Sequence, residues 1–218
     1  LGEAIGEEAN LDRVRSYARD IVQHGRRMAA IIRDFTGVTT RETSDQRQPV
    51  HLERELDQAV ATLTGSMDAS GLAIERTYAG DTCVLALPDQ LRQAFTNVLM
   101  NAIQAMKGRG TLRLSTSLTN TSAVITIADS GPGIPKQHLS KIFDPFFTTK
   151  GQGEGSGLGL TVARRIIKKF GGDIRIESQE GSGTSCIVTL PLIPLLPPLQ
   201  EASCAESKSR STPQPSPS

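Results

Sequence analysis

The stretch Asn97-Val98-Leu99-Met100-Asn101 decides the fold, because it opens a series of four clusters of polar and glycine residues in a fixed order. The other three read Asp129-Ser130-Gly131-Pro132-Gly133, Phe143-Asp144-Pro145-Phe146-Phe147-Thr148-Thr149-Lys150 and Gly155-Ser156-Gly157-Leu158-Gly159-Leu160. A single short pattern of this kind arises easily by chance. Each of the four lies at the edge of a predicted helix or strand, so together they indicate one binding pocket built from several elements.

The segments around these clusters alternate between helical and extended patterns. Apolar residues at helical spacing predict helices from Leu52 to about Met67, from Pro88 to Met106 and from Leu158 to Phe170. Alternating apolar and polar residues predict strands at Thr111–Leu118, Ala123–Ala128, Asp173–Ser178 and Thr184–Leu190. Two further extended segments, Leu72–Tyr78 and Thr82–Leu87, flank Gly80-Asp81 and are expected to pair with each other across that turn.

The predicted class is α+β: a two-layer α/β sandwich in which a mixed sheet is covered on one face by three helices. Most strands are expected to pair with their neighbours in the sequence. Residues 49–194 make up this domain, with a helix and linker before it (1–48) and a tail after it (195–218). The tail is rich in Pro, Ser, Glu and Lys and lacks aromatic residues, so we expect it to be disordered.

A heptad pattern runs through residues 11–35. Its apolar and small residues recur at alternating spacings of three and four: Leu11, Val14, Ala18, Ile21, Gly25, Met28, Ile32 and Phe35. A single helix with such a seam needs a partner, so we expect a long helix of a four-helix bundle, formed within a longer chain or between two chains. The alternative is a surface helix packed on its own domain.

The bulk composition argues against several classes of partner. With 22% charged residues and a net charge of +1 over 218 residues, the chain has no overall field that would attract nucleic acid or an acidic membrane surface. Three cysteines without metal-binding spacing favour a cytoplasmic location. No uninterrupted apolar stretch is long enough to span a bilayer. The chain opens with Leu1 in a predicted helix, so we expect a fragment that could be attached to a membrane only through upstream segments.

Two asparagines on the central predicted helix are candidate metal ligands. Asn97 and Asn101 are four residues apart, so their side chains leave the same face of the helix. Amide oxygens suit Mg²⁺, which takes oxygen ligands while bridging phosphates. They could instead be solvated helix residues, but the flanking residues make this the most apolar helix of the chain, where an amide needs a hydrogen-bonding partner.

Asp129 ends a predicted buried strand and is a candidate for base recognition. A carboxylate at this position can accept a hydrogen bond from an exocyclic amine such as that of adenine, and Gly131 and Gly133 allow the backbone to approach a flat ring. The alternative for Asp129 in isolation is a turn carboxylate without a ligand. The other clusters make that alternative the less favoured one.

The last cluster opens a predicted helix with the glycines 155, 157 and 159. Backbone amides at a helix N-terminus form an anion site when no side chains cover them. Lys150, just before this cluster, could reach a phosphate as a point charge, or could be a solvated loop residue. Together the four clusters predict a pocket for ATP and Mg²⁺.

These clusters, with Gly181-Ser182-Gly183-Thr184 as a fifth, resemble the N, G1, F, G2 and G3 boxes of bacterial sensor histidine kinases. The resemblance covers roughly residues 49–191 and is most specific in the segment 142–150. It implies that Asn101, with Asn97, holds Mg²⁺, and that Asp129 anchors adenine. The full nucleotide-binding set that it implies is Asn97, Asn101, Asp129, Gly131, Gly133, Phe147, Lys150, Gly155, Gly157, Leu158, Gly159 and Thr184. The helix at 11–35 then resembles the second helix of the dimerisation and phosphotransfer hairpin, which implies a homodimer.

The resemblance also implies a reaction. Hydrolysing members of the superfamily carry a water-activating Glu where this chain has Asn97, which cannot act as a base. Phosphoryl transfer to a side chain depends mainly on positioning and charge neutralisation. The implied function is therefore that of a histidine kinase, which passes the γ-phosphoryl group to a histidine and then to an aspartate of a response regulator.

None of the three histidines fits the phosphoacceptor position of that family. His24, His51 and His138 are each interpreted as surface or capping residues, so we expect the acceptor upstream of Leu1. The chain alone should then bind ATP without phosphorylating itself. Three alternatives remain open: a serine kinase of the anti-sigma-factor type, a nucleotide-binding or dimerisation module without turnover, and a gyrase-like ATPase.

Overall fold

The computed structural model describes residue 17 and residues 47–66, 69–80, 82–151 and 155–193. The predictions for the helix at 11–35, apart from the helical Tyr17, and for the tail at 195–218 concern residues outside this description. So does most of the linker before the first strand.

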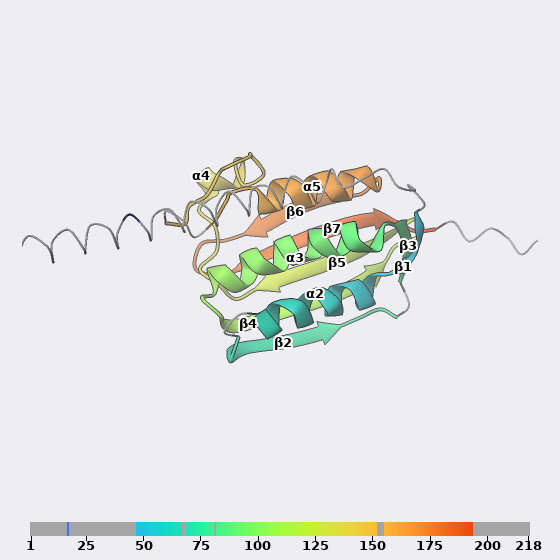
Figure 1. Ribbon diagram of the computed structural model, residues 1–218, viewed down its shortest axis with the longest axis horizontal. Coiled ribbons are helices and arrows are strands. Elements are labelled where there is room, and N and C mark those ends of the chain that lie inside the picture. Colours follow the sequence, from blue (N-terminus) through green and yellow to red (C-terminus); the bar gives the residue numbers. More distant parts are fainter. Residues whose placement is uncertain (1–16, 18–46, 67–68, 81, 152–154, 194–218) are drawn as a thin grey trace, which may run out of the picture.

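A five-stranded sheet forms one layer of the domain (Figure 1). Its strands are β2 (Gly71–Thr77), β4 (Arg109–Leu118), β5 (Ser122–Asp129), β7 (Thr184–Pro191) and β6 (Asp173–Ser178), in that spatial order. The β2–β4 pair is parallel and the other three pairs are antiparallel. The sheet is thus mixed, as predicted.

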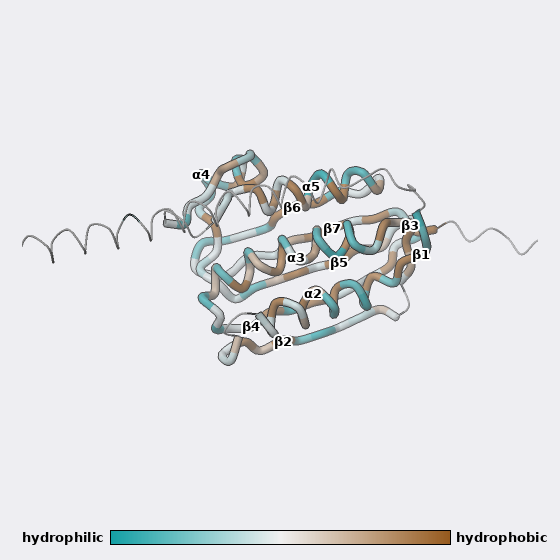
Figure 2. The backbone as a smooth tube through the Cα atoms, viewed as in Figure 1, coloured by the Kyte–Doolittle hydropathy of each residue, from teal (hydrophilic) through white to brown (hydrophobic). Residues whose placement is uncertain are grey.

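Three helices, α2 (Leu52–Ser66), α3 (Pro88–Ala105) and α5 (Gly159–Lys169), lie side by side across one face of this sheet (Figure 1). Along each of them apolar and polar segments alternate (Figure 2), as expected for helices that bury one side. A short helix, α4 (Lys136–Leu139), lies beside the end of the layer and was not predicted. The prediction of three helices on one face is confirmed.

The expected pairing of the two segments around Gly80 is wrong. The strand β3 (Cys83–Ala86) pairs with β1 (Gln48–His51) in a separate two-stranded sheet, whereas β2 pairs in parallel with β4. Parallel strands need a long crossover, which β3 and α3 together supply. The backbone of Thr82 also holds the start of β3 against α2, because its N–H donates to Glu53 Oε2 at 3.2 Å and its carbonyl accepts from Leu52 N–H at 2.9 Å.

Helix α3 lies between α2 and α5 at the centre of its layer. It begins with a proline in its first turn, and after its end the N–H of Gly108, at φ 73°, donates to Ile103 O at 3.0 Å. One side of the helix is wholly buried in the core through Phe95, Leu99 and Ile103. Asn97 and Asn101 lie on its other side and are only half-buried, so one helix supplies both core and candidate site.

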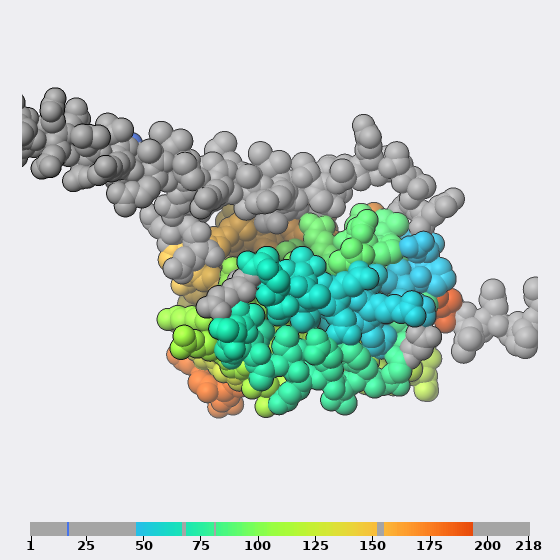
Figure 3. Space-filling view, turned by 60° about the horizontal axis from the view of Figure 1, so that its bottom comes forward, coloured from blue at the N-terminus to red at the C-terminus, as the bar shows by residue number. Residues whose placement is uncertain are grey.

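At the edge of the domain where α2 lies over β2, side-chain contacts join the helix to the strand. Asp57 Oδ1 of α2 accepts from Arg76 Nε of β2 at 2.8 Å and from Tyr78 Oη at 2.9 Å. Figure 3 shows that α2 and β2 form a continuous surface along this edge. Within the described part of the chain, no helix combines the length and apolarity needed to cross a bilayer.

Candidate functional site

The predicted metal-binding amides face the start of helix α5. A Cβ atom placed on Gly159, the first residue of α5, would lie 3.6 Å from Asn101 Nδ2 and 3.8 Å from Asn97 Cβ. The Nδ2 atom of Asn97 is buried and has no hydrogen-bond partner among the described residues. A buried amide without a partner is costly, so its retention points to a ligand on this side of α3.

Lys150 lies over the same helix face. Its Nζ atom donates to Asn101 Oδ1 at 3.3 Å and to Gln104 Oε1 at 2.5 Å. The structure therefore brings the predicted lysine and the predicted asparagine into contact. Gln104, three residues beyond Asn101 on the same helix, is a residue that the sequence reasoning missed, although its spacing could have revealed it.

The N-terminus of α5 has no side-chain cap, as an anion site requires. Leu158, just before the helix, is buried with 3% of its surface exposed and anchors this end in the core. Thr161 Oγ1 donates to Phe143 O at 3.0 Å, and the Arg164 guanidinium lies 5.0 Å from the centre of the Phe143 ring. These two contacts fix the segment before Lys150 to the first turns of α5.

Asp129 lies at the end of β5 and is held by main-chain donors. Its Oδ1 accepts from Gly131 N–H at 2.8 Å, and the backbone of Thr184 on the neighbouring strand also donates to the carboxyl group. Burial raises the pKa of Asp129 above its ordinary value, and these two hydrogen bonds only partly offset that effect. Gly131 in turn adjoins the end of α3, since a Cβ there would lie 3.6 Å from Ala105 Cβ.

Two glycines let main-chain segments pack closely in the loops around Asp129. A Cβ on Gly183, at φ 87°, would lie 2.1 Å from Asp129 O, and a Cβ on Gly133, at φ 73°, would lie 2.1 Å from Gln179 O. The N–H of Gly181 donates to Pro132 O at 2.7 Å and joins the two loops. Only glycine fits at 133 and 183, because both a positive φ and main-chain contact exclude a side chain.

Ser178 connects the loops further and was also missed in the sequence. Its Oγ accepts from Ile134 N–H at 2.8 Å, donates to Gly183 O at 2.9 Å and lies 2.9 Å from Thr184 Oγ1. The predicted residue Thr184 therefore lies beside Asp129 through its backbone and is oriented by Ser178 through its side chain. No sequence signal separated Ser178 from other strand serines.

The segment that joins the Asp129 loop to the glycines before α5 carries two neighbouring phenylalanines, Phe146 and Phe147. Phe147 makes an edge contact with the His138 ring, with ring centroids 5.6 Å apart. The Nδ1 atom of His138 is buried without a hydrogen-bond partner in the described structure, whereas the residue as a whole is half-buried. Gly157 accepts from Phe146 N–H at 3.0 Å, and Gly155 lies near Lys150, so both glycines pack on this segment.

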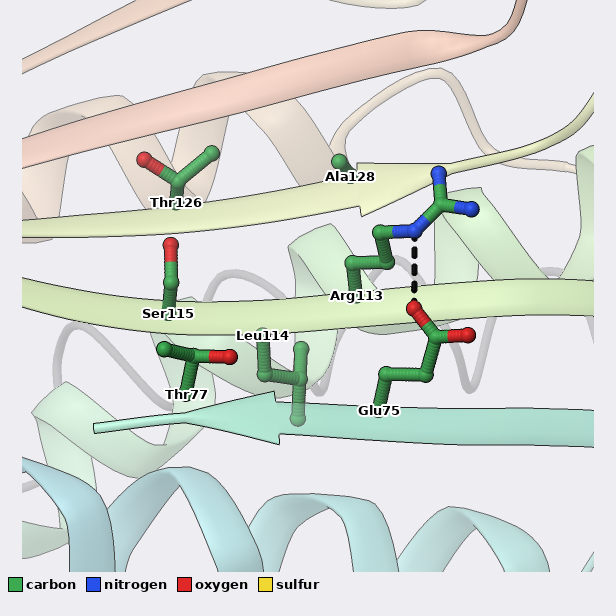
Figure 4. A pocket seen from close by; sticks show the side chains of 7 residues that line it. All are labelled: Glu75, Thr77, Arg113, Leu114, Ser115, Thr126 and Ala128. Atoms are coloured by element: carbon green, nitrogen blue, oxygen red, sulfur yellow. Dashed lines mark hydrogen bonds and ion pairs between the residues drawn. The ribbon is translucent and has the colours of Figure 1, made fainter.

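A hollow lies on the sheet face that the helices leave open (Figure 4). Short side chains of β2, β4 and β5 line it, including Thr77, Ser115 and Thr126, and Arg113 Nε donates to Glu75 Oε2 at 2.8 Å along one side. Both charged side chains are mostly exposed. None of the predicted nucleotide-binding residues lines this hollow.

The donor set limits which metal the site could hold. The described residues contain no group of three or more His, Cys, Asp or Glu side chains arranged to bind a metal. Asn101 Oδ1 already accepts a hydrogen bond from a cation, the Lys150 ammonium. An amide oxygen in this position is also a suitable ligand for a hard divalent ion. A metal here would need most of its ligands from phosphates and water, which is the usual environment of Mg²⁺.

Comparison with known proteins places this geometry in a family. Residues 86–194, half of the chain, match the family described as histidine kinase-, DNA gyrase B-, and HSP90-like ATPase. Sporulation kinase C of Bacillus subtilis is 37% identical over 143 residues, which are 65% of this chain and 33% of that protein. Sensor histidine kinase ZraS of Escherichia coli is 41% identical over 130 residues, 58% of this chain and 28% of that protein.

Solved structures agree with the sequence matches. A mycobacterial sensor histidine kinase, MprB, superposes with a TM-score of 0.61 at 27% identity, and the match covers 68% of this chain and 99% of that one. The chain spans about one third of the length of the curated relatives named above, so it corresponds to one portion of them. The chain belongs to the histidine kinase-, DNA gyrase B- and HSP90-like ATPase family, and its described part is an ATP-binding domain of the sensor histidine kinase type.

Proposed function

We propose that this chain is the ATP-binding catalytic portion of a two-component sensor histidine kinase. It would transfer the γ-phosphoryl group of Mg–ATP to a histidine outside its ATP-binding domain, and from there the group would pass to an aspartate of a response regulator receiver domain. The observation that carries the proposal is the pair Asn97 and Asn101, which faces the uncapped start of α5 with one buried amide unsatisfied.

The adenine would lie at the end of β5. Asp129 would accept from the exocyclic amine, with Gly131, Gly133 and Thr184 around the ring. Support comes from the two main-chain donors on Asp129, which orient the carboxyl group before any ligand arrives. Phe147 and Leu158 would complete the apolar walls between the base and the phosphates.

The phosphates would lie between α3 and α5. The amides at the start of α5, with Gly155, Gly157 and Gly159, would bind phosphate oxygens, and Lys150 would neutralise charge beside them. Asn101, with Asn97, would hold Mg²⁺ through amide oxygens, and the ion would supply charge neutralisation across the phosphates. The cationic contact that Asn101 already makes with Lys150 supports this assignment.

The absence of a carboxylate at position 97 favours transfer over hydrolysis. An amide cannot remove a proton from water, whereas a phosphoryl acceptor with its own nucleophile needs no such base. The domain would therefore position and orient ATP, exclude water and leave the nucleophile to a histidine on another segment. His51 in β1 and His138 beside Phe147 are not proposed as that acceptor.

The remaining parts of the proposal concern partners. The heptad at 11–35 would form a four-helix bundle between two copies of the chain, which makes the functional unit a homodimer. The domain boundaries would be those predicted above, at residues 49 and 194. Because the reaction consumes ATP, we place this portion in the cytoplasm.

The test combines nucleotide binding with phosphate release. Calorimetry with ADP and a non-hydrolysable ATP analogue, with and without Mg²⁺, should show metal-dependent binding in the wild type and none in Asp129→Asn. Phosphate release from ATP should stay near background, and Asn97→Glu should raise it by installing a base.

Two results would contradict the proposal. Rapid, steady phosphate release by the wild type would indicate an ATPase. After incubation with radiolabelled ATP, acid-labile phosphate on His24 would show that the acceptor lies within this chain.

A further inference from the structure

We propose that Gln104 is a positioning residue of the nucleotide site: its amide oxygen holds the Lys150 ammonium against Asn101, so that the lysine and a divalent metal compete for Asn101 Oδ1. This inference rests on the proposed function, because it assigns an additional residue to the same site. Its basis is the bridging geometry of the ammonium between two oxygens of one helix.

The two contacts of the ammonium differ in length. Lys150 Nζ lies 2.5 Å from Gln104 Oε1 and 3.3 Å from Asn101 Oδ1. Of these two oxygens, Gln104 Oε1 therefore makes the closer contact with the ammonium. All three side chains are half-buried, so water screens these contacts less than it would at an exposed surface.

Helical spacing makes this arrangement a stable one. Asn97, Asn101 and Gln104 are separated by four and three residues, so they form one polar stripe along α3. The metal-binding oxygen and the lysine-holding oxygen are thus adjacent but distinct. When a metal binds Asn101, Gln104 keeps the ammonium within one helical turn of it, beside the phosphates.

This arrangement has two measurable consequences. Without metal, the ammonium held at Asn101 supplies the positive charge next to the phosphates, so it supports nucleotide binding. With metal, the same ammonium must be displaced from Asn101, so it lowers the gain in affinity that the metal provides. Loss of Gln104 should weaken both effects without removing the lysine.

The experiment measures the affinity of a fluorescent ADP analogue in EDTA and in saturating Mg²⁺ for the wild type, Lys150→Met, Gln104→Leu and the double variant. In EDTA, Lys150→Met should weaken binding about tenfold, as expected for loss of one charge-assisted contact, and Gln104→Leu about threefold. The ratio of the affinity in Mg²⁺ to the affinity in EDTA should rise in both. The double variant should match Lys150→Met alone, because Gln104 acts through the lysine.

Gln93→Leu is the matched control, since it makes the same change about three turns earlier on α3. It should leave both affinities unchanged. A wild-type ratio in Gln104→Leu, or additive losses in the double variant, would overturn the positioning role while leaving the nucleotide site intact. Absence of any nucleotide binding by the wild type would overturn the proposed function and this inference together.

Discussion

The two ends of the candidate site are built in different ways. Around Asp129 the contacts are made by the main chain: Gly131 and Thr184 donate backbone N–H groups, and Gly183 lies against the Asp129 carbonyl. Around Asn101 they are made by side chains, with Lys150 and Gln104 meeting across a helix face. We call these the base end and the phosphate end.

The difference decides how each end responds to substitution. At the base end, main-chain contacts hold the loops that would surround the ligand, so a substitution that disturbs the backbone there should lower binding and stability together. At the phosphate end, the helices are held by their buried sides, and the site residues project from the other side. Their replacement should change binding while the fold is kept. Four substitutions test this contrast.

The largest effect is expected from Gly183→Ala at the base end. A methyl group there would lie 2.1 Å from Asp129 O at a φ of 87°. We expect a loss of about 2–4 kcal/mol in the free energy of unfolding and no measurable nucleotide binding. Chemical denaturation and calorimetry would measure the two losses.

Gly181→Ala is the control for Gly183→Ala. Its φ of 79° is similar, but nothing lies within 4 Å of the added methyl group. It should cost only about 1 kcal/mol, the strain of the left-handed backbone alone. Equal losses at 181 and 183 would show that main-chain contact with Asp129 is not what makes the base end sensitive.

Asp129→Asn should separate binding from stability at the base end. Asn retains an oxygen for the Gly131 N–H but presents donors to the adenine amine, so nucleotide affinity should fall about 100-fold. The apo protein should be no less stable at neutral pH. Burial raises the folded-state pKa above the unfolded-state value, so ionisation of the wild-type carboxyl group costs stability above both values.

That pH dependence has a definite sign. As the pH falls through the raised pKa of Asp129, the cost of ionisation disappears, and the wild type should approach the stability of Asp129→Asn. Nucleotide affinity of the wild type should fall over the same range, which begins above the usual range of an aspartate. Thermal unfolding and binding measured from pH 7 downward would check both, and a pH-independent affinity would contradict the role of the carboxylate.

At the phosphate end, Asn97→Leu should move binding and stability in opposite directions. The Asn97 Nδ2 atom is buried without a partner in the described structure, so an apolar side chain should raise the free energy of unfolding by about 1 kcal/mol. Affinity for Mg–ADP should fall about tenfold. A loss of stability in this variant would show that Asn97 supports the fold, and the contrast between the two ends would fail.

The smallest effect is expected from Arg47→Ala, at the far end of α5 from the phosphates. Arg47 Nη2 donates to Lys169 O at 3.1 Å, and its guanidinium lies 5.6 Å from the centre of the Phe170 ring. Loss of both contacts at a helix C-terminus should cost about 0.5–1 kcal/mol. Arg175→Ala, which removes an exposed pair with Glu177, should cost less. An Mg–ADP affinity changed by Arg47→Ala would show that the phosphate end depends on how α5 is held at its other end.

Much of the domain could be predicted because its patterns are local. Helices α2, α3 and α5 and strands β4 to β7 follow from apolar periodicity, which reports which side of an element is buried. Helical spacing puts Asn97 and Asn101 on one side of α3, and Gly159 at the start of α5 lies next to them. The predicted hairpin around Gly80 was wrong, because periodicity identifies a strand without identifying the strand that it pairs with.

The sequence by itself determined the class of fold, the order of the site clusters and the chemistry of their side chains, since all three depend on residue type and spacing. Only the tertiary structure decided that β2 pairs with β4, that Gln104 holds Lys150, and that Ser178 orients Thr184. The physical reason is distance along the chain. Lys150 and Gln104 are 46 residues apart, and contacts of that kind depend on the packing of whole elements and leave no local pattern.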